Sequence, residues 1–234
     1  MKQQAFHYWK YDIDCFENIS EAYFTAQYWQ NINAIEGQEN GRGTTWFIQH
    51  KNKHLVLKHY LRGGLIGKIS HDHYIFNGWK NCRAIREFNI LNELHEQGFR
   101  VPKPAAAQII RHGLSYQNDL FTHRIPKAQD LVQVLKSAQS PHFYNNLGKT
   151  IAEFHNHGIF HADLNIQNIL QDDQDQLWLI DFDQAKRVKP SQRWQLNNLK
   201  RLKRSFEKEK IRFGVQWQES DWNIFLNAYQ ETIS

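Results

Sequence analysis

The segment HADLNIQNIL, residues 161–170, and the segment LIDFD, residues 179–183, restrict the fold of this chain more than any other feature. The apolar runs NIL and LWLID have the composition of buried strands, and the polar stretch QDDQDQ between them predicts a turn. The two outer ends of such a hairpin lie side by side. We therefore expect the amide of Asn168 and the carboxylate of Asp181 to meet at one point.

This group of side chains has the composition that phosphoryl transfer requires. The reaction needs a base that orients the attacking hydroxyl, and oxygen ligands that hold Mg²⁺ on the nucleotide phosphates. Asp163 is the candidate base. Asn168 and Asp181 are the candidate Mg²⁺ ligands, because hard oxygen donors suit this ion. Taken singly, each of the three could be an ordinary turn residue.

The same residues resemble two loops of the protein-kinase-like fold. HADLNIQN is similar to the catalytic loop H-x-D-x-x-x-x-N, and IDFD is similar to the metal loop D-F-G. The resemblance implies a catalytic role for Asp163 and ATP as the phosphoryl donor, with Mg²⁺. His161 is interpreted as a packed, hydrogen-bonded residue that shapes the loop.

Upstream segments match the nucleotide-binding parts of that fold. GRGTTWFI resembles the glycine-rich loop over the phosphates, with Gly41 and Gly43 in place and Trp46 at the third glycine position. Lys58 in LVLKHY matches the strand lysine that contacts the phosphates, and Glu87 matches its ion-pair partner. The six matching positions follow the family's order, which makes coincidence a poor explanation.

Each upstream match also has an ordinary structural reading. The two glycines could form a simple hairpin turn, and Lys58 could be a solubilising residue on an edge strand. Glu87 could pair with Arg83 one helical turn earlier. However, Glu87 shares a helix face with Leu91 and Leu94, so its charge needs a partner on the apolar side. Lys58 is the expected partner.

Periodicity predicts strands first and helices later. Residues 44–60 and 105–125 read as antiparallel hairpins, residues 81–98 and 141–158 read as helices, and the last fifty residues have a helical composition. We therefore predict an α+β, bilobal, protein-kinase-like fold. Residues 1–125 would form an N-terminal lobe of antiparallel sheet plus one helix, and residues 126–234 a mainly helical C-terminal lobe, with ATP bound between them.

Departures from the protein-kinase pattern narrow the range of molecules that could accept the phosphoryl group. Ala162 replaces the arginine before the catalytic Asp, Asn165 replaces the lysine of Ser/Thr kinases, and Asp183 replaces the glycine of D-F-G. No A-P-E segment follows, and only 53 residues remain after Asp181. Small-molecule and sugar kinases of this superfamily share these simplifications.

Longer segments resemble one family of sugar kinases. LVLKHYLRGGLIGKISHDHYIF and GRGTTWFI are similar to the Gram-negative 3-deoxy-D-manno-octulosonic acid (Kdo) kinases of lipopolysaccharide assembly. The resemblance implies ATP-dependent phosphorylation of the 4-hydroxyl of Kdo on a lipid A precursor. Alternatives are a kinase for heptose or another small-molecule hydroxyl, a protein kinase, and a non-catalytic binding module. The stretch that contains Arg62, Gly63, Gly64 and Lys68 is either a flexible basic loop or an ordinary solvated connection.

The charge distribution points to an anionic partner. The chain carries a net charge of +5, whereas residues 186–212 alone hold eleven basic and two acidic residues, a net +9. Such a segment suits an anionic membrane surface and the phosphates of a lipid-linked acceptor. A solvated helix face and a nucleic-acid surface are the alternatives. No zinc, RNP or helix-turn-helix signature supports nucleic acid, so none is expected. The segment's residues Lys200, Arg201, Lys203 and Arg204 are not among those predicted to handle the phosphates.

Two further features bear on location. Cys15 and Cys82 are too few for a disulfide framework, which predicts a reducing cytoplasm. No run approaches the roughly 18 apolar residues of a membrane span. The sequence therefore predicts a peripheral protein on the cytoplasmic face of the inner membrane, without a transmembrane segment.

Overall fold

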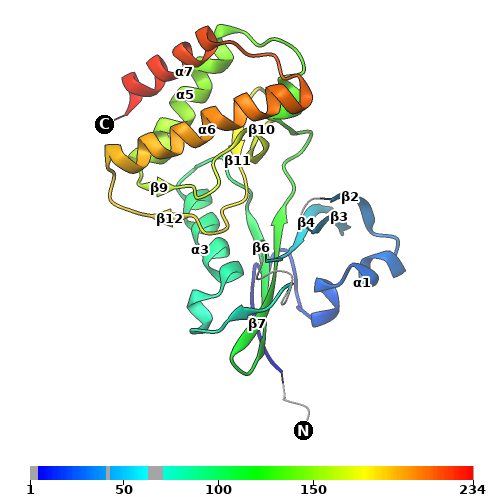
Figure 1. Ribbon diagram of the computed structural model, residues 1–234. Helices are drawn as coiled ribbons and strands as arrows, with labels where there is room; N and C mark the ends of the chain where they lie inside the picture. The colour runs from blue at the N-terminus through cyan, green and yellow to red at the C-terminus, as the bar shows by residue number, and fades with distance from the viewer. Residues whose placement is uncertain (1–4, 41–42, 63–70, 234) are drawn as a thin grey trace. The chain divides into compact units, whose positions relative to one another are not determined.

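The chain divides into two units, Met1–Arg124 and Ile125–Ser234, shown as a ribbon in Figure 1. The computed structural model describes residues 5–40, 43–62 and 71–233. The division falls one residue before the boundary expected between residues 125 and 126. The roles assigned to the two lobes remain predictions.

An antiparallel sheet of seven strands forms the framework of the first unit. Along the sheet the order is β1-β6-β7-β4-β3-β2, and β5 pairs with β7. The strands are β1 (Phe6–Tyr11), β2 (Ile35–Asn40), β3 (Thr44–His50), β4 (Lys53–His59), β5 (Tyr74–Ile75), β6 (Pro104–His112) and β7 (Ser115–His123). The two hairpins expected from the sequence, β3/β4 and β6/β7, are both confirmed.

Helices complete the first unit. They are the 3-10 turns η1 (Glu21–Phe24) and η2 (Trp79–Asn81) and the α-helices α1 (Ala26–Asn31) and α3 (Arg83–Glu96). The helix expected at residues 81–98 is α3. The expectation of a single helix is wrong, because α1 is a second one. Its six residues are too few for a periodic pattern, and α1 buries Trp29 completely while the indole Nε1 donates to the Tyr23 carbonyl at 2.6 Å.

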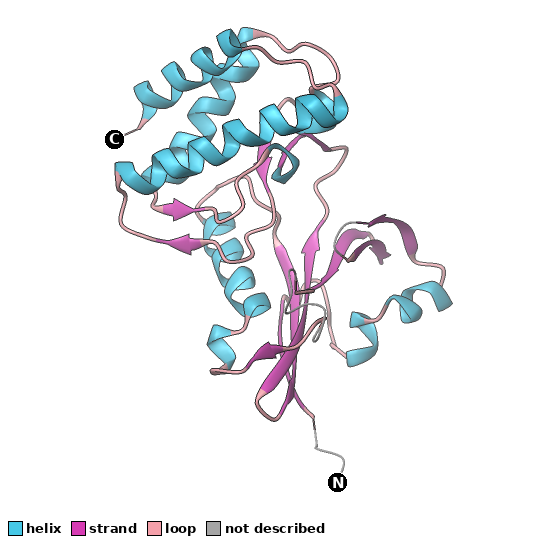
Figure 2. Ribbon diagram, viewed as in Figure 1, coloured by secondary structure: helices cyan, strands magenta, loops and turns pink. Residues whose placement is uncertain are grey.

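The second unit combines long helices with short strand pairs, as Figure 2 shows. Its helices are α4 (Leu131–Val134), α5 (Pro141–Asn156), η3 (Ile166–Asn168), α6 (Gln192–Phe213) and α7 (Glu219–Thr232). Its strands are β8 (Gln129–Asp130), β9 (Ile159–Phe160), β10 (Ile169–Gln171), β11 (Leu177–Leu179) and β12 (Lys186–Arg187). One small sheet has the order β11-β10-β8, and β12 pairs with β9. The expected α+β class with an antiparallel sheet is confirmed.

Local signals in the sequence set the ends of the long helices. The Ser140 hydroxyl accepts from the Phe143 N–H at 3.4 Å, and Pro141 occupies the first turn of α5. Gly214, with a φ of 68°, ends α6 in the left-handed conformation. Within residues 5–40, 43–62 and 71–233, no helix has the length and apolar character needed to cross a bilayer.

The helices α5 and α7 approach each other closely at Gly148. A Cβ atom added there would lie 2.3 Å from the Phe225 carbonyl oxygen and 3.0 Å from the Tyr229 backbone nitrogen. Both neighbours are backbone atoms, which cannot rotate away as a side chain can. The glycine therefore allows the two helices to pack at this distance, and α5 and α7 carry His155 and Tyr229, which support the site described below.

We expect Gly148→Ala to destabilise the protein by about 1–3 kcal/mol through overpacking. The measurement is the urea midpoint, with the slope of the transition as a check on two-state unfolding. Gly37→Ala is the matched control, because its Cβ would meet only Phe47 Cδ2, at an ordinary 3.5 Å. Equal midpoints for Gly148→Ala and the wild type would show that the two helices can separate at no cost.

Candidate functional site

In the first unit, the structure brings together Lys58 on β4 and Glu87 on α3. The Lys58 Nζ atom lies 4.0 Å from Glu87 Oε2, and the Glu87 side chain is only 3% exposed. The hydroxyl of Tyr60 also donates to Glu87 Oε2. A buried carboxylate needs such partners, because removing its charge from water is costly. The ion pair expected from the sequence is present, whereas Tyr60 was not anticipated.

The described part of the glycine-rich segment lies at the Lys58 end of the β3/β4 hairpin. Thr45 pairs with Lys58 in the strand register, and Gly43 stands two residues before Thr45. A Cβ atom on Gly43 would lie 2.7 Å from Leu61 Cδ1, so this side chain would have to shift. Gly41 lies outside the described residues, as does most of the Arg62–Lys68 stretch. Their predicted roles stay predictions.

In the second unit, the loop around Asp163 is held by two asparagine side chains. The Nδ2 atoms of Asn165 and Asn168 both donate to the Asp163 carbonyl oxygen at 2.9 Å. The Oδ1 atom of Asn165 also accepts from the Gln167 N–H at 2.9 Å and from the Asn168 N–H at 3.2 Å, which caps η3. Asn165, noted in the sequence only as a departure from protein kinases, thus fixes the backbone between the candidate base and the candidate metal ligand.

His161 joins this loop to the segment before Asp181. Its Nδ1 atom accepts from the Asp163 N–H at 3.2 Å, so the proton resides on Nε2, which donates to the Ile180 carbonyl at 2.9 Å. Burial lowers the pKa of His161, while the charges of Asp181 and Asp163 act in the opposite direction. The interpretation of His161 as a packed, hydrogen-bonded residue is confirmed.

The β10/β11 hairpin places Asn168 and Asp181 at its shared end. Ile169 pairs with Leu179, and the Ile180 N–H donates to the Asn168 carbonyl at 3.0 Å. Asp181 has a φ of 60°, an uncommon conformation for a residue other than glycine. The expected hairpin that joins these two positions is confirmed, while their role as metal ligands stays a prediction.

The donor set fits Mg²⁺. The Nδ2 atom of Asn168 is occupied by the Asp163 carbonyl, which leaves the amide oxygen as the atom for a cation. One amide oxygen and one carboxylate suffice, because Mg²⁺ keeps several waters and takes other ligands from substrate phosphates. Among the described residues, no group of three or more His, Cys, Asp and Glu side chains is arranged to hold a metal. The described residues therefore contain no site in which three or more such side chains would coordinate a metal without substrate ligands.

A chain of hydrogen bonds connects the helices to the loop. The Tyr229 hydroxyl on α7 donates to His155 Nδ1 at 2.8 Å, and His155 Nε2 on α5 donates to Asn198 Oδ1 at 3.4 Å. The Nδ2 atom of Asn198 on α6 then donates to the His161 carbonyl at 3.0 Å. A second contact lies further along α6, where the Ser205 hydroxyl accepts from the Ile166 N–H at 3.1 Å. Sequence reasoning missed Asn198 and Ser205.

The side chain between these two contacts on α6 is Arg201, and its guanidinium pairs with the Asp163 carboxylate. The two side chains are 47% and 46% exposed. Arg201 was not in the phosphate-handling set expected from the sequence, whereas the structure places it in contact with the candidate base. The reason is the docking of α6, which turns this one residue toward the loop.

Comparison with known proteins identifies the family. The sequence profile of the lipopolysaccharide kinase (Kdo/WaaP) family matches residues 26–229. The chain belongs to this family. A 3-deoxy-D-manno-octulosonic acid kinase of Vibrio parahaemolyticus is 43% identical over 219 residues, which cover 93% of this chain and 92% of the relative. The kinase of the same name from Mannheimia succiniciproducens is 39% identical over 236 residues, covering 97% and 98%. The resemblance to Kdo kinases is confirmed, and the chain is a kinase.

The support of the loop depends on a neutral His155. Burial lowers the pKa of His155 from the usual 6.5 to about 4. As the pH falls below about 6.5, the unfolded chain takes up this proton before the folded one does, so stability present at neutral pH is lost in acid. We expect the buried histidine to account for about 2 kcal/mol of the stability lost between about pH 7.5 and about pH 5.

The measurement compares urea unfolding of the wild type and His155→Gln at both pH values. The variant is expected to be less stable at neutral pH but to lose less stability in acid. His142→Gln, an exposed histidine of the same helix, is the control and should follow the wild type. An unchanged pH dependence in His155→Gln would mean that His155 takes up its proton at the same pH in both states.

Proposed function

We propose that this kinase transfers the terminal phosphoryl group of ATP to the 4-hydroxyl of Kdo on a lipid A precursor. The proposal is supported by the family and by the printed name shared by several relatives. The observation that carries it is the loop in which Asn165, Asn168 and His161 hold the backbone of Asp163. A carboxylate on a rigid loop is what orientation of an acceptor hydroxyl requires.

The roles follow from the chemistry of each side chain. Asp163 accepts the proton of the attacking hydroxyl, and Asn168 and Asp181 hold Mg²⁺. When bound, the ion neutralises charge on the phosphates of ATP. Lys58, kept beside Glu87, contacts those phosphates, and Gly41 and Gly43 allow the backbone to approach them.

We expect Asp163→Ala to lower turnover by roughly 10²- to 10⁴-fold, because positioned proton transfer contributes about that much. The assay follows transfer from labelled ATP to a Kdo-lipid acceptor, a heptose-lipid acceptor and a generic protein, and NMR of the product locates the phosphate. ATP affinity should stay near the wild-type value, since Asp163 holds no part of the nucleotide.

Asp173→Ala provides the control, because it removes a carboxylate of the same unit that pairs with Lys127 at 2.7 Å. Its turnover should equal that of the wild type. Full activity in Asp163→Ala would remove Asp163 as the base. Preference for the heptose-lipid or the protein would replace Kdo as the acceptor.

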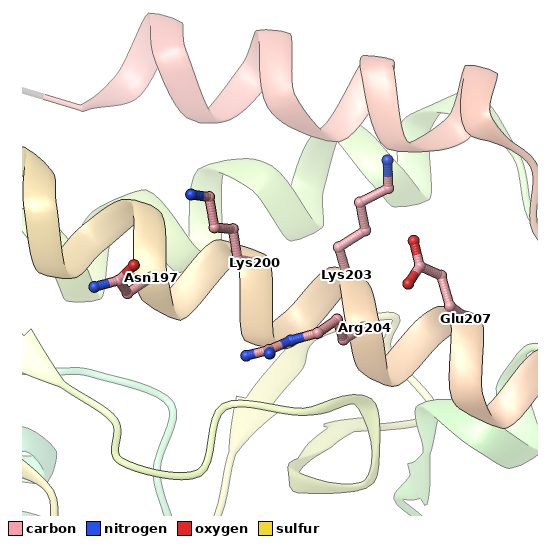
Figure 3. A pocket seen from close by; sticks show the side chains of 5 residues that line it. All are labelled: Asn197, Lys200, Lys203, Arg204 and Glu207. Carbon is pink, nitrogen blue, oxygen red and sulfur yellow. The ribbon is translucent and has the colours of Figure 1, made fainter.

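We further propose that the enzyme works at the cytoplasmic face of the inner membrane as a peripheral protein. Within the basic segment, Arg193, Lys200 and Arg204 are exposed and lie along one side of α6. Lys200 and Arg204 also line a pocket of about 410 Å³. Figure 3 shows this pocket, which is lined by Asn197, Lys200, Lys203, Arg204 and Glu207. A cationic surface of this kind attracts anionic lipid and the phosphates of a lipid-linked acceptor.

Reversal of Arg193, Lys200 and Arg204 to Glu should weaken co-sedimentation with anionic vesicles. Binding of the wild type should fall with salt, because the Debye length shrinks from about 10 Å at 0.1 M to about 3 Å at 1 M. Reversal of the exposed Lys80, Lys136 and Lys149 is the control, since it changes net charge equally but lies outside the basic segment. Equal sedimentation of both variants would exclude a localised membrane surface on α6. Arg201 is left intact because it contacts Asp163.

A further inference from the structure

Arg201 occupies a fixed place beside the candidate base. Asn198, three residues before it on α6, donates to the His161 carbonyl at 3.0 Å, and Ser205, four residues after it, accepts from the Ile166 N–H at 3.1 Å. Residues three and four apart lie on neighbouring parts of one helix face. Arg201 is thus held over the loop from both sides, while its guanidinium reaches the Asp163 carboxylate.

The Arg201 guanidinium can bind a second anion while it contacts Asp163. The recorded contact uses the Nη2 atom of Arg201, and a guanidinium has five N–H donors. Both side chains are nearly half exposed, at 47% and 46%, so an incoming group can reach them from solvent. An exposed ion pair contributes at most about 1 kcal/mol, so rearranging it for a ligand costs little.

We propose that Arg201 binds the carboxylate of an acidic sugar acceptor and so brings the acceptor hydroxyl to Asp163. This inference rests on the proposed function and names the part of the acceptor that is recognised. Arginine suits the task because its planar fork pairs with a carboxylate through two parallel hydrogen bonds. Arg201 therefore determines specificity for an acid over a neutral sugar.

The chemistry of the acceptor agrees with this placement. A 3-deoxy-octulosonic acid carries its carboxylate and its 4-hydroxyl on ring carbons separated by a single methylene group. A guanidinium and a carboxylate that touch each other can therefore contact these two groups at once. In the transfer step, the hydroxyl oxygen forms a bond to the terminal phosphorus of ATP while the bond from that phosphorus to ADP breaks. The hydroxyl proton passes to Asp163.

Other cations of α6 are less suited to this role. Lys203 pairs with Glu219 at the start of α7 and lies 5.9 Å from the Trp222 ring centroid. Lys200 and Arg204 line the pocket together with Lys203. They add positive charge on the same helix, whereas Arg201 is the α6 cation with a recorded contact to Asp163.

The test measures KM and kcat with two water-soluble acceptors, the methyl glycoside of Kdo and the same glycoside with its carboxylate converted to a carboxamide. The wild type should prefer the carboxylate by roughly 10- to 100-fold in kcat/KM, as expected for hydrogen bonds to a charged group. Arg201→Ala should raise KM for the carboxylate and reduce this preference to near unity. Arg201→Lys should restore part of it, because the charge remains but the fork is lost.

Lys149→Met is the control, an exposed lysine on α5 outside the basic segment, and should keep the wild-type preference. A fall in kcat on both acceptors with the preference intact would overturn the inference and leave Arg201 as a positioning residue for Asp163. A raised KM for ATP alone would also overturn it, by assigning Arg201 to the phosphates. If the wild type phosphorylates neither glycoside nor the Kdo-lipid, the proposed function fails and the inference fails with it.

Discussion

The hydrogen-bond chain from Tyr229 through His155 and Asn198 to His161 is the interaction on which the second unit depends. It links α7, α5 and α6 to the loop of Asp163 through buried groups, where an unpaired donor or acceptor is costly. Each hydrogen bond in this series has a defined donor and acceptor, since His155 accepts at Nδ1 and donates at Nε2. Because Asn198 Nδ2 donates to the His161 carbonyl, Asn198 Oδ1 accepts from His155 Nε2. Burial that keeps His155 neutral then leaves its Nδ1 atom as the acceptor for the Tyr229 hydroxyl.

The helix α6 has three sides with different contacts: one is buried, one contacts the loop of Asp163, and one is exposed to solvent. At 100° per residue, Asn198, Leu202 and Phe206 fall on the buried side and pack against the rest of the unit. Arg201 and Ser205 flank that side and contact the loop. Arg193, Lys200 and Arg204 lie on the side exposed to solvent. The basic residues of α6 therefore differ in what they contact, and the net charge of the helix alone does not predict the effect of replacing any one of them.

Local patterns made much of this structure predictable. The hairpins, α3, α5 and the β10/β11 turn each carry a periodic or turn signal within a few residues, and the loops of Asp163 and Asp181 follow a known spacing. The contacts that sequence reasoning missed join distant positions: Tyr60 with Glu87, Asn198 with His161, and Arg201 with Asp163. The spacing of residues in the sequence does not indicate which distant side chain a polar residue will contact. These pairs therefore had to be found in the folded structure.

The positive charge beside Asp163 is supplied by Arg201 of α6, which is distant in sequence, and not by the loop itself. The segment from Asp163 to Asn168 contains no basic residue, and Asn165 stands at the position of the lysine that Ser/Thr protein kinases have there. Asn165 instead uses both ends of its amide to hold the backbone. The positive charge beside Asp163 therefore comes from α6, whose position depends on Asn198 and Ser205. Support of the loop and supply of its cation are thus two results of one docking contact, and a change that loosens α6 removes both together.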